Sequence, residues 1–271
     1  MPDPRGRRTP RLATAEVLRT ERLTPHMTRV VLGGAGLDGF AAGEFTDHYV
    51  KLQFPRPGVE YPEPFDLGRI REELPREHWP VTRTYTVRRW DAAERELWLD
   101  FVVHGDEGVA GPWAANAKPG EPLRFAGPGG AYAPASDAGW HLLVGDESAL
   151  PAIASALERL PADARARAFV EVSGPEEEQR LETAGDVELT WLHRGEAPVG
   201  ERLVEAVRGL DLSGDVQAFV HGEAGYVKAL RRLLVAERGL PKSRTSISGY
   251  WRLGHNEDSW QATKREFDPP A

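Results

Sequence analysis

Apolar and polar residues alternate in short runs along the first half of the chain, up to about residue 135. Alternation with a period of two places every second side chain on one face of a β-strand, and turn residues separate the runs. The predicted strands are Ala13–Arg19, Thr28–Leu32, Tyr49–Phe54, Arg83–Trp90, Glu96–Val103 and Pro122–Ala126. Six short strands of this kind predict a closed, all-β antiparallel barrel.

The pattern changes after Trp140, where short apolar strands alternate with amphipathic helices. The predicted strands are Trp140–Val144, Ala168–Val172, Val187–Leu192, Val216–His221 and Thr245–Ser248. The predicted helices are Ala149–Leu160, Pro175–Leu181, Gly200–Val207 and Gly225–Glu237. This order predicts an α/β Rossmann-like domain with a parallel sheet covered on both faces. The turn-rich stretch Pro134–Gly139 separates the two patterns, so we expect one domain over residues 1–135 and a second over 136–271.

Two segments between the predicted barrel strands are unusual. Residues Gly33–Gly39 fit the dinucleotide fingerprint G-x-G-x-x-G through Gly34, Gly36 and Gly39. A strand precedes this stretch but no helical period follows it, so we interpret it as a turn and not as a phosphate site. The Pro-rich stretch Pro55–Pro80 is longer than a compact barrel needs, which is typical of a functional or mobile loop.

Composition and charge exclude several classes of protein. The chain has 271 residues, a net charge of −8 and a pI near 5.6, which argues against a nucleic-acid-binding surface. No apolar run approaches the roughly 20 residues of a membrane helix, and the basic run Arg5–Arg11 lacks the apolar segment of a signal peptide. The absence of cysteine excludes disulfides and Cys-ligated iron–sulfur clusters and fits a cytoplasmic protein. His48 has no partners at metal-ligand spacing, so no resident metal is expected.

A cation and an aromatic ring are spaced two residues apart in the predicted strand Arg83–Arg88. Strand alternation places Arg83 and Tyr85 on one face and Thr84 and Thr86 on the other. Arg83 supplies a forked cation suited to a pyrophosphate, and Tyr85 supplies a flat face for an aromatic ring. The same residues could instead make ordinary cross-strand pairs.

A second candidate element follows the next predicted strand. The segment Asp100–Ala114 ends that strand, turns through Gly105 and Gly108, and enters a short predicted helix with Pro112 in its first turn. An amide-rich helix start can receive phosphate oxygens without a charged side chain.

The α/β half has its own candidate site, because ligands of an open α/β sheet bind beyond the carboxyl ends of the strands. The first strand-to-helix turn is Gly145–Ala149, in which Ser148 either contacts a ligand or caps the following helix. The second strand ends in Glu171, where an acidic group accepts hydrogen bonds from the ribose of NADH and repels the extra phosphate of NADPH. Glu176–Glu178 follow with no arginine among them, which favours NADH, although they could simply be the first turn of a solvated helix.

Taken together, these motifs resemble the siderophore-interacting protein family, the FAD-dependent ferric-siderophore reductases related to ferredoxin-NADP reductases. The resemblance covers nearly the whole chain. It rests on motifs in family-like order at Asp47–Pro55, Arg83–Arg88, Asp100–Gly105, Gly145–Ala152, His221–Glu223 and Gly249–Gly254. It implies an FAD-binding barrel over residues 1–135 and an NAD(P)H-binding α/β domain with a C-terminal tail over 136–271.

The resemblance also implies which residues contact the two nucleotides. Those expected at the flavin and its phosphates are Arg83, Tyr85, Thr86, Val87, Tyr250 and Trp251, and those near the FAD tail are Asp100, Val102 and His104. Those expected around the pyrophosphate are Gly108, Val109, Ala110 and Gly111, and those for NAD(P)H are Asp146, Glu147, Ser148, Glu171 and Glu223. The family often has Gly-Pro-Ala-Ser where this chain has Gly-Val-Ala-Gly at 108–111, so the backbone bonds to phosphate are expected here without the side-chain bond of the serine hydroxyl.

The implied reaction passes electrons from NADH, or less favourably NADPH, through FAD to the Fe³⁺ of a siderophore, and it needs no acid–base residue. Many ferric siderophores are anionic, so cations should line the substrate site. Lys51 matches the strand lysine of the family, and Lys264 and Arg124 are further candidates, although each of the three could also be a solvated surface cation.

Two other functions remain open at this level. One is a generic NAD(P)H:flavin or ferredoxin-type reductase without siderophore specificity, and the other is a non-enzymatic siderophore carrier that contains FAD. In each case we expect a cytoplasmic monomer or weak dimer with no nucleic-acid partner.

Overall fold

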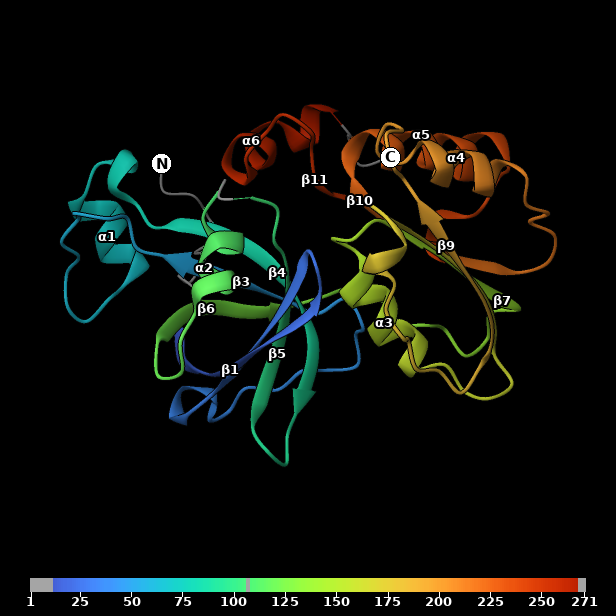
Figure 1. Cartoon of the computed structure of the whole chain (residues 1–271). Coiled ribbons are helices and arrows are strands. Elements are labelled where there is room, and N and C mark those ends of the chain that lie inside the picture. Colours follow the sequence, from blue (N-terminus) through green and yellow to red (C-terminus); the bar gives the residue numbers. More distant parts are fainter. Residues whose placement is uncertain (1–11, 106–107, 268–271) are drawn as a thin grey trace, which may run out of the picture.

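The computed structural model describes residues 12–105 and 108–267, which form a barrel and an α/β part side by side (Figure 1). The basic run Arg5–Arg11 lies outside the described residues. The barrel strands are β1 (Ala13–Thr24), β2 (Met27–Gly33), β3 (Tyr49–Phe54), β4 (Val81–Asp91), β5 (Glu96–Val102) and β6 (Pro122–Gly129). They close in the order β1-β2-β5-β4-β3-β6 with antiparallel neighbours, so the predicted barrel is confirmed.

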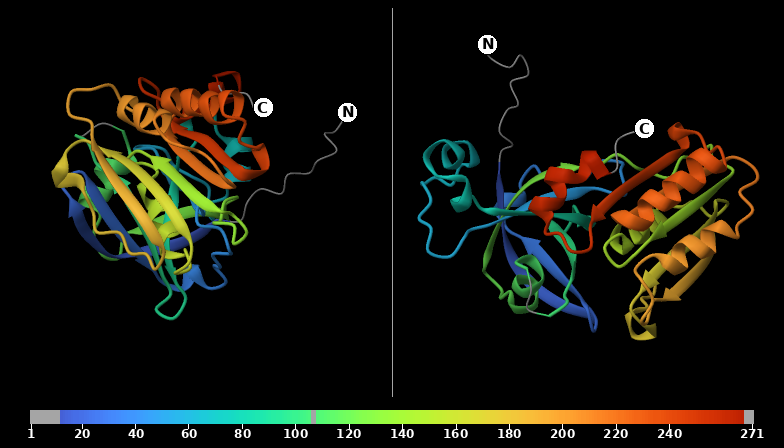
Figure 2. Two further views of the ribbon diagram at one scale, coloured as in Figure 1. Left: turned by 90° about the vertical axis from the view of Figure 1, so that its right-hand side faces the viewer. Right: turned by 90° about the horizontal axis from the view of Figure 1, so that it is seen from above.

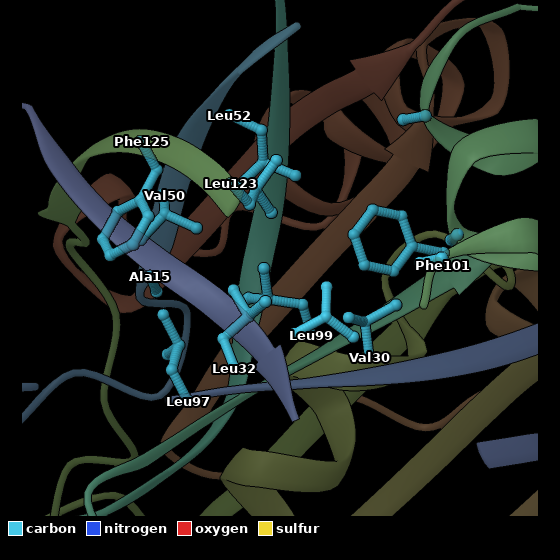
Figure 3. Packing of buried hydrophobic residues seen from close by; sticks show 14 of the residues in the cluster. Ala15, Val30, Leu32, Val50, Leu52, Leu97, Leu99, Phe101, Leu123 and Phe125 are labelled. Atoms are coloured by element: carbon cyan, nitrogen blue, oxygen red, sulfur yellow. The ribbon is translucent and has the colours of Figure 1, made fainter. Parts of the chain in front are cut away.

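Alternate residues of the barrel strands point inward and form its core (Figure 3). Val30 and Leu32 of β2 and Leu97, Leu99 and Phe101 of β5 are fully buried at a spacing of two residues. The hydrophobic alternation in the sequence therefore follows the inward face of each strand.

The loops of the barrel contain short helices. The glycine-rich stretch Gly33–Gly39 holds one 3₁₀ turn, η1 (Ala35–Leu37), and then leads towards β3, which confirms that it is a turn between strands. The Pro-rich excursion contains α1 (Leu67–Glu73) and the 3₁₀ turn η2 (Arg76–His78), neither of which was predicted. The predicted short helix after β5 is α2 (Ala110–Asn116).

The second part is a five-stranded parallel sheet in the order β11-β10-β7-β8-β9. Its strands are β7 (Trp140–Gly145), β8 (Arg165–Val172), β9 (Asp186–His193), β10 (Val216–Glu223) and β11 (Thr245–Trp251). Helix α3 (Leu150–Glu158) packs on one face, and α4 (Glu201–Arg208) and α5 (Ala224–Arg231) pack on the other. Successive residues of β7 confirm this two-sided burial, because Leu143 joins the cluster around α3 while Leu142 and Val144 join the cluster around α4 and α5.

The predicted helices differ from the structure at two places. Pro175–Leu181, predicted as a helix, forms a single 3₁₀ turn, η3 (Pro175–Glu177), because the Glu177 side chain turns away to bind the barrel. The predicted helix Gly225–Glu237 is α5 followed by a π-helical stretch, η4 (Arg232–Glu237). A final helix, α6 (Glu257–Phe267), was not predicted.

Contacts at several places hold the two parts together. The Glu177 carboxylate accepts hydrogen bonds from Thr24 Oγ1 at 2.5 Å and from the His26 amide at 3.2 Å, in the turn between β1 and β2. Arg88 of β4 forms a two-pronged ion pair with Glu158 of α3. Helix α6 follows β11 and lies between the sheet and the barrel (Figure 2), where it contacts β4. No helix in the part of the chain described by the structure is long and apolar enough to cross a membrane.

Candidate functional site

Strand β4 carries the motif Arg83–Arg88 and has one edge that is only partly paired. Residues Val81–Thr86 pair with β3, whereas the register with β5 begins at Val87 within the described residues. The amide of Thr84 points away from β3, because it donates to Glu257 of α6 at 3.1 Å. This edge of β4 therefore presents backbone groups to a partner other than a strand.

Arg83 and Tyr85 lie two residues apart on β4, as the alternation predicts. The Arg83 guanidinium donates to the carbonyl of Thr82 at 2.7 Å and lies 3.7 Å from Asp258 of α6. The ring of Tyr85 packs against Phe101 with centroids 4.1 Å apart, and burial raises the pKa of its phenol. Arg83 remains partly exposed, with 16% of its side chain accessible, so its cation can bind an anion at this edge.

The end of β11 brings two further predicted residues to β4. Tyr250 is half-buried beside Thr86, and desolvation raises the pKa of its phenol while a hydrogen bond with Thr86 opposes the shift. Trp251 donates its indole N–H to Asp146 at 2.9 Å. Thr86 and Val87 are buried at the same junction, where the Val87 amide donates to the carbonyl of His48 at 2.6 Å. The structure therefore places Tyr250 and Thr86 together, although 164 positions separate them in the sequence.

The residues predicted for the FAD pyrophosphate begin α2. Gly108 is exposed, Val109 is half-buried and Ala110 packs into the barrel core. No side chain caps this helix start within the described residues. A Cβ at Gly111 would lie 3.1 Å from the carbonyl of Val102, so Gly111 allows a close approach of helix and strand. His104 is exposed in the turn before α2.

Asp100 has a different environment from the one that the resemblance implies. Its carboxylate accepts two hydrogen bonds from Arg29 of β2, at 2.7 and 2.8 Å, and lies 3.9 Å from Arg88. Burial acts to lower the pKa of Arg29, but the hydrogen bond and charge of Asp100 outweigh it and raise that pKa. Asp100 is 3% exposed, so both its oxygens serve an ion pair in the barrel wall.

Three residues predicted for NAD(P)H form an internal network at the sheet edge. Asp146 is fully buried and accepts hydrogen bonds from the Ser148 hydroxyl at 2.5 Å and from the Glu223 amide at 2.7 Å. Burial is the main cause that raises the pKa of Asp146. Glu223 caps α5 by accepting from the Gly225 amide, and Ser148 does not cap α3. These side chains therefore fix the turns after β7 and β10.

The other two predicted NAD(P)H residues meet an arginine that sequence reasoning missed. Arg194, just after β9, lies 2.8 Å from Glu147 and 3.4 Å from Glu171. Glu171 also accepts from the Gly200 amide at 2.8 Å, whereas its Oε2 is buried without a hydrogen-bond partner. Burial raises the pKa of Glu171. A carboxylate at the end of the second strand is where ribose hydroxyls are accepted in such sheets, but the orphaned oxygen of Glu171 lies below the surface.

The three candidate substrate cations do not form one cluster. Lys51 of β3 is exposed directly opposite Thr84 of β4. Arg124 of β6 lies over the ring of Phe65 from the Pro-rich excursion, at 4.6 Å, so this excursion borders the same barrel face. Arg124 also lines a cavity of about 330 Å³ together with Gln53, Phe54, Pro55, Val109, Trp113, Pro122 and Leu123. Lys264 of α6 instead donates to Ser248 of β11 at 3.0 Å.

The residues at this edge of β4 are better suited to binding a flavin nucleotide than to a purely structural role within the sheet. A partly unpaired strand edge, a partly exposed cation and an aromatic ring on β4 adjoin the Tyr250 end of β11. A ring system could meet the backbone of β4, and its phosphates could meet Arg83. Arg83, Tyr85, Thr86 and Tyr250 lie at this edge, whereas Asp100 lies in the barrel wall, where it binds Arg29.

The arrangement of barrel and sheet defines a class of fold. It superposes on the ferredoxin reductase of carbazole 1,9a-dioxygenase with a TM-score of 0.63 and 18% identity, covering 89% of this chain and 68% of that one. At this identity the likeness shows a ferredoxin-reductase-like fold and nothing of the substrate.

The chain belongs to the siderophore-interacting protein family. The family model for the siderophore-interacting FAD-binding domain matches residues 16–132, and the model for siderophore-interacting protein matches residues 138–254. The family resemblance seen in the sequence is thereby confirmed.

Similar proteins cover almost the whole chain. A siderophore utilization protein from T. fusca has 40% identity and a TM-score of 0.79, over 92% of this chain and 95% of that one. The NADPH-dependent ferric-chelate reductase of Escherichia coli has 36% identity over 87% of this chain and 91% of its own. The ferric vibriobactin reductase of Vibrio cholerae has 33% identity over 90% of this chain and 91% of its own.

Proposed function

We propose that this protein is a ferric-siderophore reductase that uses NADH and FAD to reduce chelated Fe³⁺ and release Fe²⁺. The observation that carries the proposal is the edge of β4, where Arg83 and Tyr85 flank Thr84, the partner of the exposed Lys51 of β3, and adjoin Tyr250 from the α/β part. A nucleotide on that edge would lie between an anion-attracting barrel face and the carboxyl end of the sheet. Two relatives named as ferric reductases support the assignment.

In this proposal the barrel, residues 1–135, holds FAD, and residues 136–271 hold the nicotinamide nucleotide. FAD, when bound, supplies the chemistry of accepting a hydride and passing on single electrons. Arg83 binds the FAD phosphates, Tyr85 and Tyr250 confine the ring, and the backbone near Thr86 meets its polar edge. Lys51 attracts the anionic chelate, with Arg124 on the same face and Lys264 further away. Released Fe²⁺ leaves because hard oxygen ligands hold it weakly.

The nicotinamide donor and the setting belong to the same proposal. We propose NADH as donor, on the strength of Glu171 at the end of β8, although the Escherichia coli relative has NADPH in its name. We also propose that the protein works in the cytoplasm, where the donor is present, as a monomer or weak dimer.

The test begins with the absorbance spectrum of the purified protein after FAD addition and gel filtration. We expect a flavin band that bleaches on anaerobic addition of NADH and returns on addition of a ferric hydroxamate or catecholate. A protein that stays colourless because it does not bind added FAD would overturn the proposal. A flavin that stays oxidised with NADH and with NADPH would indicate a carrier. A reduced flavin that free flavins or quinones reoxidise, but ferric siderophores do not, would indicate a generic reductase.

A further inference from the structure

An ion triad lies at the carboxyl edge of the sheet, where the adenosine end of a nicotinamide nucleotide binds in open α/β folds. Arg194 uses both ends of its guanidinium on Glu147, at 2.8 and 3.3 Å, and reaches Glu171 at 3.4 Å. Glu147 and Arg194 are 16% and 18% exposed, whereas Glu171 is fully buried. The arginine and one carboxylate can therefore meet a ligand at the surface, and the second carboxylate lies beneath them.

The triad contains both groups that select between the two nucleotides. An acidic group after the second strand accepts the ribose hydroxyls of NADH, and a nearby arginine accommodates the 2′-phosphate of NADPH. Here Glu171 lies fully buried beneath the other two residues, so Glu147 is the carboxylate of the triad that a ribose can reach. Arg194 would suit a phosphate, but its fork is already occupied by Glu147.

The charge balance decides which nucleotide the triad accepts. Two carboxylates and one guanidinium leave one negative charge in excess. A 2′-phosphate brings between one and two further negative charges and would have to displace Glu147 from Arg194. The ribose hydroxyls of NADH bring no charge and leave the Glu147–Arg194 pair intact.

We propose that Glu147 sets the preference for NADH by occupying Arg194, which would otherwise receive the 2′-phosphate of NADPH. This inference rests on the proposed function, because it concerns the donor of the same reaction. Glu147 thus acts on specificity through Arg194 and takes no part in electron transfer.

The test is equilibrium binding of NAD⁺ and NADP⁺ to the FAD-loaded protein by calorimetry, with stopped-flow reduction of the flavin by NADH and NADPH in parallel. We expect wild-type protein to bind NADP⁺ at least tenfold more weakly than NAD⁺. Glu147→Gln should narrow this ratio at least fivefold, by tightening NADP⁺ binding. Arg194→Gln removes the cation and should not narrow the ratio, since only carboxylates then face the phosphate.

Glu178→Gln is the matched control, because Glu178 is a more exposed carboxylate that pairs with His193, the residue before Arg194, at 2.7 Å. It removes the same charge nearby without freeing the arginine. An unchanged ratio in Glu147→Gln, or an equal narrowing in Glu178→Gln, would overturn the inference. So would equal affinity of the wild-type protein for both nucleotides. Failure of both nucleotides to bind and to reduce the flavin would instead overturn the proposed donor, and the inference with it.

Discussion

A substitution at Asp100 distinguishes a role in FAD binding, which the family resemblance implies, from a role in stability, which the ion pair with Arg29 indicates. The family resemblance places Asp100 near the FAD tail, whereas the structure places both its oxygens on Arg29 and one near Arg88. The substitution Asp100→Asn keeps the shape of the side chain and removes its charge. It leaves Arg29, which is 12% exposed, without an anionic partner in the barrel wall.

The expected effect is therefore on stability. Removing one partner of a buried ion pair costs about 3–5 kcal/mol, and Asn should lie at the lower end, about 3 kcal/mol, because its oxygen still accepts one hydrogen bond. For a domain of this size, that loss lowers Tm by about 6–12 °C. FAD affinity of the folded variant should change less than twofold, because both carboxylate oxygens are already bound to Arg29.

The assay is differential scanning fluorimetry of the apo-protein together with a titration of FAD at a temperature well below either transition. Asp38→Asn is the control, because Asp38 pairs with Arg95 but is 63% exposed, and such a surface pair contributes at most about 1 kcal/mol. An unchanged Tm combined with a large loss of FAD affinity would refute the reasoning and return Asp100 to the cofactor site.

Four other results are expected. Arg83→Ala should lower FAD retention after gel filtration by removing a charge-assisted contact of about 1.5–3 kcal/mol, and retention equal to that of wild type would remove Arg83 from the site. Lys51→Ala should raise the KM for anionic ferric chelates and leave flavin reduction by NADH unchanged, so an unaltered KM would contradict its role. Glu177→Gln should accelerate hydrogen exchange in the turn between β1 and β2, since it weakens the bonds to Thr24 and His26; identical exchange would mean that this contact does not hold the two parts together. Burial, aided by the charge of Lys264, lowers the pKa of His221 from 6.5 to about 3. Between these two pH values the unfolded state binds a proton at His221 and the folded state does not, so stability falls as pH drops below about 6.5. His221→Gln should flatten this acid limb in a plot of Tm against pH, and two parallel curves would count against the explanation.

Most of the fold could be predicted from the hydrophobic pattern of its strands. Barrel strands bury one face and sheet strands bury both, and each kind of burial leaves its own pattern in the sequence. The period of two in β2 and β5 follows the inward face of the barrel, and the apolar runs of β7 and β10 follow a sheet covered on both faces. Helix α6 escaped prediction because its polar surface is large, and its position depends on contacts with β4 and β11. The helix predicted at Pro175–Leu181 was wrong because a tertiary contact of Glu177 outweighed the local pattern.

The candidate site was predictable where its residues are close in the chain. Arg83 and Tyr85 follow from strand alternation alone, and the structure keeps them on one edge. The ion pair of Asp100 with Arg29 spans 71 positions, so no local sequence pattern predicts it. Arg194 lies 23 positions beyond Glu171, and only the parallel register of β8 with β9 brings them together. Knowing that the two strands are neighbours would have directed attention to the residue after β9.

The bond between Glu257 and Thr84 spans 173 positions, which has a consequence for biogenesis. A chain made from its N-terminus folds its early domain first, so the barrel can assemble while the last helix is still inside the ribosome. During that interval α6 does not cover the edge of β4, so FAD could reach the site proposed there. Translation then delivers α6, whose Glu257 binds Thr84, so FAD present during synthesis should bind faster than FAD added to the complete chain.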